Sequence, residues 1–120
     1  MATGPIYHKS FAFAVRVIKL ARFLQAEKRE FVISKQVLRS GTAIGALVRE
    51  GAHAESKSDF THKMSVALKE ANETLYWLEL LHASELIDRP SFESIAGDND
   101  ELLRLLVAIV KTSKGITNIN

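Results

Sequence analysis

The sequence has no cysteine, so disulfides and thiolate metal sites are excluded, and a reducing compartment suits the composition. No uncharged apolar run reaches the roughly 18 residues of a membrane span. The first ten residues lack the apolar core of an export signal, and we therefore expect a cytoplasmic protein with no membrane partner. Only two prolines occur, and the strict apolar–polar alternation of half-buried strands is absent, which predicts an all-α protein.

The 120 residues are enough for one domain with a real core. We expect a single domain over residues 1–120, ordered over about 7–114 and frayed over 115–120. The net charge is only +2, but it is unevenly distributed. Residues 1–57 carry 10 basic and 4 acidic side chains, whereas residues 58–120 carry 6 basic and 10 acidic ones. This asymmetry predicts a basic face on the N-terminal half.

Apolar residues recur at helical spacing in four segments joined by short polar connections. The predicted helices cover residues 7–25, 34–53, 59–86 and 91–114. Short connections place consecutive helices antiparallel, so the fold class is an up-down-up-down four-helix bundle. Gly97-Asp98-Asn99 should break or kink the last helix.

The first predicted helix carries two apolar stripes. One contains Tyr7, Phe11, Ala14, Ile18 and Ala21, and the other contains Phe13, Val17, Leu20 and Leu24. Two stripes are more than one neighbouring helix needs. Either the helix is buried on a wide side of the bundle, or one stripe faces another subunit.

Capping and glycine signals refine the second and third helices. Ser34 offers an N-cap, and Ser56 with Asp59 forms a Ser-x-x-Asp capping pattern. Gly41 and Gly45 lie one turn apart inside a helix, where each costs about 1 kcal/mol relative to alanine. We expect a neighbouring helix to approach closely at both glycines.

Four-helix bundles can hold di-metal carboxylate sites built from Glu-x-x-His pairs. Glu50 with His53 and Glu79 with His82 form two such pairs. In an antiparallel bundle these pairs lie roughly 25 Å apart along the axis, too far for one cluster. A smaller site from Glu50, His53 and His62 remains an alternative to solvated histidines. We predict no metal and no cofactor.

Glu70 and Glu73 share one helix face and could serve acid–base chemistry in a pocket that raises their pKa. The alternative is a buried structural network, which we favour because interior carboxylates are normally paired. Its predicted members are Arg39, Arg49, Glu50, Glu70 and Glu73. No Ser–His–Asp arrangement, phosphate-binding glycine loop or nucleotide motif is present, so we predict no catalytic residue.

The basic residues of the N-terminal half are dense enough for phosphate contacts. The candidate nucleic-acid-binding residues are Arg16, Lys19, Arg22, Lys28, Arg29 and Lys35. The alternative is an ordinary solvated helix face, because Phe23 and Phe31 are the only aromatic residues nearby for base stacking. A ring of several chains would multiply the basic patch and favour binding.

Two stretches, RSGTAIGALVREGAHAESKSDF from Arg39 and KMSVALKEANETLYWLELL from Lys63, carry a family pattern. They resemble the bacterial four-helix-bundle proteins encoded in intervening sequences of 23S rRNA genes. The matching positions are Arg39, Ser40, Ile44, Glu50, Asp59, Phe60, Ala67, Leu68, Glu70 and Glu73, whereas Leu47 stands where many members have Asn. The resemblance covers about residues 7–114. It implies a homopentameric ring, and a similar bundle, the accessory variability protein of diversity-generating retroelements, binds a reverse transcriptase and nucleic acid.

Taken together, these patterns predict a non-enzymatic oligomer that acts as a nucleic-acid- or ribonucleoprotein-associated adaptor. Its partners would be further copies of itself, RNA or DNA, and a co-encoded protein. One alternative is a protein–protein interaction scaffold without nucleic-acid binding, and another is a metal- or carboxylate-based enzyme. Fold alone does not decide among them.

Overall fold

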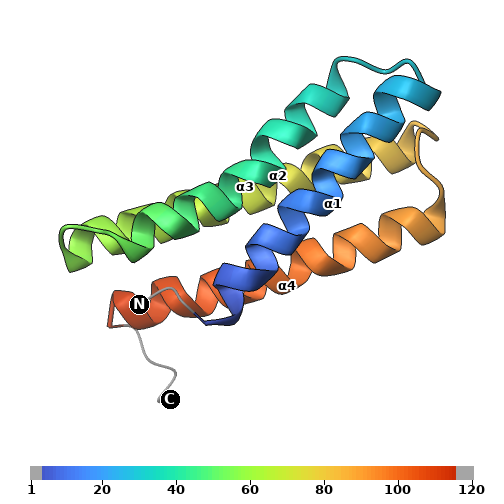
Figure 1. The fold of residues 1–120 in the computed structure, drawn as a ribbon. Coiled ribbons are helices and arrows are strands. Elements are labelled where there is room, and N and C mark those ends of the chain that lie inside the picture. The colour runs from blue at the N-terminus through green and yellow to red at the C-terminus, as the bar shows by residue number, and fades with distance from the viewer. Residues whose placement is uncertain (1–3, 116–120) are drawn as a thin grey trace.

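The computed structural model of the chain describes residues 4–115, which form four α-helices and no strand. The helices are α1 (Pro5–Glu27), α2 (Ile33–Ala52), α3 (Lys57–Ala83) and α4 (Arg89–Ser113), and each runs back along its predecessor (Figure 1). The predicted all-α four-helix bundle is therefore confirmed. Residues 116–120 of the predicted frayed tail lie outside the described residues.

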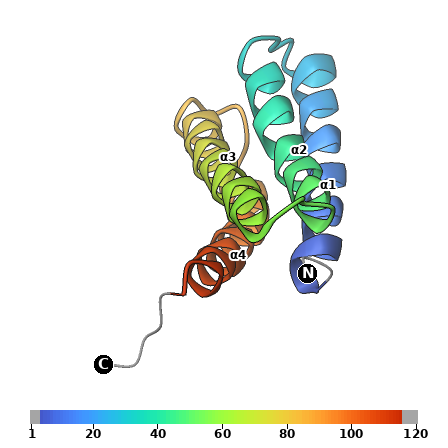
Figure 2. The ribbon, with the colours of Figure 1, turned by 90° about the vertical axis from the view of Figure 1, so that its left-hand side faces the viewer.

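One apolar face of each helix points into a common core. Its largest fully buried side chains include Phe13, Leu24, Ile44, Met64, Leu78, Leu81, Leu102 and Leu106. Each helix packs along the next one in the chain, whereas α1 and α4 meet over a shorter stretch. Figure 2 shows the α1–α2 and α3–α4 hairpins diverging toward the end that carries both hairpin turns. The seam between α1 and α4 is therefore the open side of the bundle.

The two glycines of α2 lie against α1, as predicted. A Cβ atom at Gly41 would lie 2.8 Å from both Cγ atoms of Val17, and one at Gly45 would lie 3.4 Å from the carbonyl oxygen of Ser10. Because carbon atoms pack at about 3.5–4.0 Å, a side chain at Gly41 does not fit without movement. The glycines let α1 and α2 approach at close range.

Helix α4 runs without interruption from Arg89 to Ser113, so the predicted break at residues 97–99 is wrong. Asn99 is buried, and its Nδ2 donates a 3.1 Å hydrogen bond to the Ala71 carbonyl of α3. Asp98 forms an ion pair with Arg16 of α1. These contacts hold both sides of the turn in place, and they outweigh the roughly 1 kcal/mol that Gly97 costs inside a helix.

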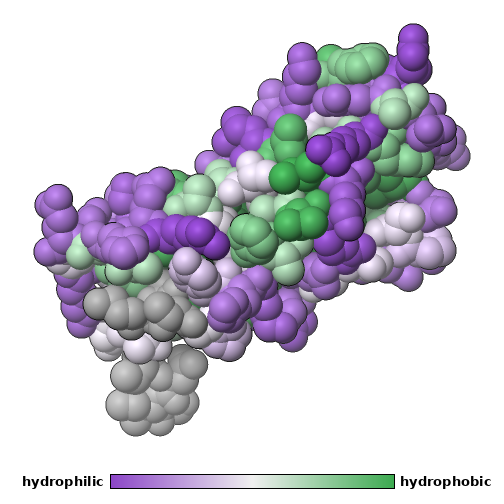
Figure 3. Space-filling view, in the orientation of Figure 1, coloured by the Kyte–Doolittle hydropathy of each residue, from purple (hydrophilic) through white to green (hydrophobic). Residues whose placement is uncertain are grey.

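Only one of the two predicted apolar stripes of α1 enters the core. Phe13, Val17 and Leu24 are buried, whereas Phe11 is 57% exposed and Ile18 is 38% exposed. Figure 3 shows hydrophobic side chains gathered over the middle of α1. We name the exposed set Phe11, Val15 and Ile18 the α1 stripe.

None of the four helices, over the residues described, is both long and apolar enough to cross a bilayer.

Candidate nucleic-acid interface

The turn between α1 and α2 carries basic residues on a fixed backbone. The N–H groups of Lys28 and Glu30 both donate to the Leu24 carbonyl, at 3.1 and 3.0 Å. Arg29 adopts a left-handed conformation with φ of 53°. This arrangement of two backbone bonds around a left-handed residue is a helix C-cap that usually uses glycine. The turn is therefore rigid, although its sequence contains no glycine or proline.

Helix α2 is capped by Glu30. Its carboxylate accepts hydrogen bonds from the N–H groups of Val32, Ile33 and Ser34 at 3.0, 2.8 and 2.7 Å. Partial burial raises the pKa of this carboxyl, but the three N–H groups outweigh that effect and hold the pKa below 4.5. The predicted Ser34 cap is wrong, because Ser34 lies inside α2 and its hydroxyl donates to the Glu30 carbonyl.

The turn between α3 and α4 is fixed in a similar way. Glu85 has φ of 61°, and the Leu86 N–H donates to the Leu81 carbonyl at 2.9 Å. Asp88 caps α4 by accepting from the Ser91 N–H at 2.9 Å. Hydrogen bonds from the Ser91 hydroxyl and N–H lower the pKa of Asp88, and the nearby charges of His82 and Lys28 add to this effect. Asp88 therefore remains an anion at neutral pH.

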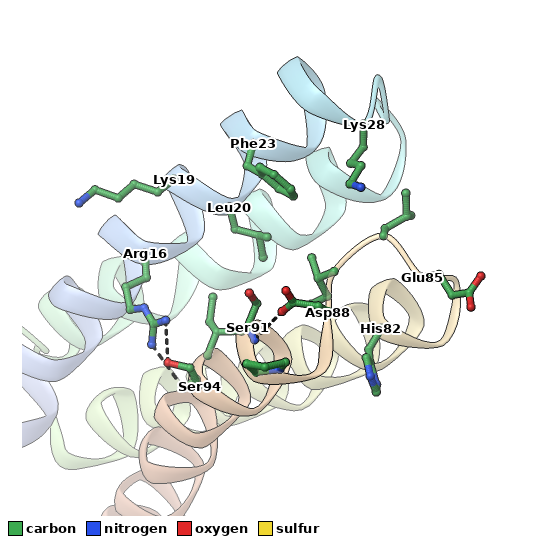
Figure 4. Close-up of a pocket in the computed structure, with 14 residues that line it drawn as sticks. Arg16, Lys19, Leu20, Phe23, Lys28, His82, Glu85, Asp88, Ser91 and Ser94 are labelled. Atoms are coloured by element: carbon green, nitrogen blue, oxygen red, sulfur yellow. Dashed lines mark hydrogen bonds between the residues drawn. The ribbon is translucent and has the colours of Figure 1, made fainter.

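A groove of about 990 Å³ lies between the second half of α1 and the start of α4, and Figure 4 shows its side chains. The floor is apolar and is formed by Leu20, Phe23, Leu86, Ile87 and Ile95. Figure 3 shows the same region as a hydrophobic hollow with hydrophilic side chains around it. Because residues from three helices and one fixed turn line the groove, the bundle holds it open.

Polar contacts close the seam beyond the groove. Arg16 Nη1 lies 2.6 Å from Asp98 Oδ2, and its Nη2 donates to the Ser94 hydroxyl at 3.0 Å. Further along, Lys9 pairs with Glu101 at 3.0 Å. These two ion pairs join α1 to α4 where few apolar contacts exist.

The six predicted nucleic-acid-binding residues do not form one continuous face. Arg16, Lys19 and Lys28 line the groove, whereas Arg22, Arg29 and Lys35 are exposed and do not line it. In Figure 4, Lys28 points into the groove and Lys19 extends away from its rim. Among residues 4–115, five of the six have no carboxylate within 4.0 Å, and Arg16 is the exception.

The predicted network of five charged residues forms only in part. Arg39 Nη1 lies 3.2 Å from Glu70 Oε1, and its other terminal nitrogen bonds the Glu73 carboxylate. The indole N–H of Trp77 donates to the same Glu73 carboxylate at 2.9 Å. Hydrogen bonds from Trp77 and then Arg39 lower the pKa of Glu73. The Arg39 side chain is 51% exposed, so this is a surface cluster and the predicted burial is wrong.

Arg49 and Glu50 lie outside that cluster, in contrast to the prediction. The Arg49 guanidinium lies over the rings of Tyr7 and Phe11, at 4.8 and 5.4 Å from their centroids. Glu50 pairs with Lys63 at 3.0 Å. Both residues lie more than two helical turns beyond Arg39 on α2, so they meet α1 and the start of α3 instead. Within residues 4–115, no group of three or more His, Asp or Glu side chains is placed to hold a metal ion.

Sequence reasoning missed the groove and the exposed apolar pair beside it. Phe31 and Val32 in the α1–α2 turn are 49% and 72% exposed. The signal was present, because an apolar pair next to Lys28 and Arg29 in a short polar connection has no core to enter. The groove left no such signal, since Leu86 and Ile87 read as the end of a helix.

Comparison with known proteins places these features in a family. No curated protein matches the chain. A solved crystal structure of a protein of unknown function, from the S23 ribosomal protein family of Bacteroides thetaiotaomicron VPI-5482, is 54% identical and superposes with a TM-score of 0.88. The match covers 88% of this chain and 98% of that chain. The model of the 23S rRNA-intervening sequence proteins matches residues 4–108, nearly the whole bundle, and the chain belongs to that family.

Proposed function

We propose that the protein is a non-enzymatic, cytoplasmic adaptor that binds RNA through the basic end of its bundle. The observation that carries this proposal is the set of five cations without a carboxylate partner: Lys19, Arg22, Lys28, Arg29 and Lys35. Cations that are already neutralised gain little from a phosphate, whereas free ones release counterions when they bind it. The family's association with 23S rRNA genes agrees with RNA as the ligand.

The rigid α1–α2 turn supports the same proposal. Lys28 and Arg29 are attached to a backbone that is fixed by two hydrogen bonds and by the Glu30 cap. Ordering a loop on binding costs free energy, and this turn is already ordered. Phosphate contacts from this end therefore require only side-chain ordering.

The test is the salt dependence of RNA affinity, measured by fluorescence anisotropy with a labelled single-stranded RNA. We expect affinity to fall steeply between about 50 and 200 mM salt. Replacing both Arg22 and Lys35 by Ala should reduce the salt slope by about 2, because each lost phosphate contact removes about 1. The matched control replaces Lys69 and Lys111, which are exposed on α3 and α4, and should leave the slope unchanged. No binding at about 50 mM salt would refute the proposal.

We further propose that a second copy covers the α1 stripe and that repetition of this contact closes a ring of five. The stripe is apolar, exposed and continuous along α1, and such patches on small domains usually meet a partner. Mass measurement in solution should give an oligomer for the native chain and a monomer for Ile18→Asp. A monomeric native chain at all concentrations would refute this contact.

The same stripe is the observation that favours the second candidate function, a protein-interaction scaffold. In that case a different protein covers the α1 stripe, and its binding depends little on salt. Ile18→Asp should then abolish binding to the partner, and the Arg22 and Lys35 replacement should not. The two functions thus respond to opposite sets of substitutions.

A further inference from the structure

We infer that the groove between α1 and α4 takes an unpaired base of single-stranded RNA, with Phe23 as its stacking platform. This inference rests on the proposed function and adds to it the class of RNA and the place where a base is bound. It uses side chains that the electrostatic argument does not need.

The groove has the three parts that a nucleotide requires. Its floor offers the Phe23 ring, which is 42% exposed, among aliphatic side chains. Lys28 Nζ lies 5.9 Å from the centroid of that ring, so a ring face and a phosphate-binding cation occur within reach of one nucleotide. Aromatic rings accept any base by stacking, and flanking cations hold the phosphates.

The opposite wall of the groove carries hydrogen-bonding groups. Asp88 presents an anionic carboxylate there, and Ser91 and Ser94 present hydroxyls. A base has amino and imino donors along its edge, which an acidic residue and hydroxyls can accept. An acidic peptide or a fatty acid would instead place its own anion or an apolar chain beside Asp88. The asymmetry of the groove therefore favours a nucleotide, with its phosphate toward α1 and its base edge toward α4.

A duplex does not meet these requirements. Its bases are stacked and paired inside the helix, and sequence-tolerant stacking on protein rings needs bases that are splayed out. The volume of about 990 Å³ lies within the range of small-ligand sites. Because both turns that border the groove are fixed by backbone hydrogen bonds, the site is formed before RNA arrives.

The experiment uses a short oligouridine RNA with one internal 2-aminopurine, whose fluorescence reports stacking, and a blunt RNA duplex of equal length. Native protein should bind the single strand and change its fluorescence. Phe23→Ala should weaken single-strand binding roughly fivefold or more, the lower limit for one base–aromatic stack, and should remove the fluorescence change. Phe23→Leu, which keeps the apolar contact with the bundle, should behave in the same way.

The matched control is Phe31→Ala. Phe31 is as exposed as Phe23 but does not line the groove, so single-strand binding should stay within twofold. Circular dichroism verifies that each variant is folded. If the Phe23 variants bind the single strand as the native protein does, the groove inference is wrong while the proposed RNA function stands. If the native protein binds no RNA at low salt, the proposed function fails as well.

Discussion

The close approach of α1 and α2 gives a quantitative prediction for Gly41→Ala. The new methyl group would lie 2.8 Å from both Cγ atoms of Val17, which is roughly 0.7 Å inside normal carbon–carbon contact. Val17 is fully buried and β-branched, so it cannot rotate away. Overpacking of this kind costs about 1–3 kcal/mol, and the helix-propensity gain of alanine offsets about 1 kcal/mol. We expect a net loss of about 1 kcal/mol in the free energy of unfolding.

Urea denaturation followed by circular dichroism measures this loss. Gly97→Ala is the matched control, because no atom lies within 4 Å of a Cβ at Gly97, also inside a helix. It should raise stability by about 0.4–1 kcal/mol. In a double-mutant cycle, combining Gly41→Ala with Val17→Ala should cost roughly 1 kcal/mol less than the sum of the single changes. If Gly41→Ala stabilises the protein as Gly97→Ala does, the steric reasoning is refuted.

Three further changes test the polar contacts. Trp77 is the only tryptophan, so its fluorescence should titrate with Glu73 at a midpoint below pH 4.5; Arg39→Ala should raise that midpoint, and a midpoint that stays unchanged would contradict the contact. Glu30→Gln should cost about 1 kcal/mol at neutral pH. Because the folded pKa of Glu30 is lowered, its contribution is present above pH 4.5 and is lost as the pH falls through the folded value, so urea denaturation should find native and variant converging in acid. Asn99→Asp should destabilise the protein by roughly 3 kcal/mol at neutral pH, and less in acid, because a buried carboxylate would have no donor besides the lost amide; equal stability of the two proteins at neutral pH would show that Asn99 is not buried as described.

The fold could be predicted from the sequence because helical periodicity and short connections leave little choice of topology. The Ser56 cap was predicted correctly, since its hydroxyl accepts from the Asp59 N–H at 3.0 Å. The break at residues 97–99 could not be judged locally, because the contacts that hold α4 straight come from Arg16 and Ala71 on other helices. Tertiary contacts overrode the local signal there.

The candidate site was predictable only as a set of charges. Sequence spacing identified Lys19 and Lys28, but it could not show that Phe23 lies beside them over an apolar floor. That juxtaposition depends on how far α1 and α4 diverge. The network prediction failed for Arg49 for a related reason, because the rings of Tyr7 and Phe11 come from another helix.

The layout of the bundle has a practical consequence for experiments. Pro5, where α1 begins, and Ser113, where α4 ends, lie toward one end of the molecule, and both hairpin turns and the groove lie toward the other (Figure 1). An affinity tag or a surface tether fused at either terminus is therefore attached far from the groove. Immobilised protein should present its basic end to the solution, so biosensor measurements can use either fusion.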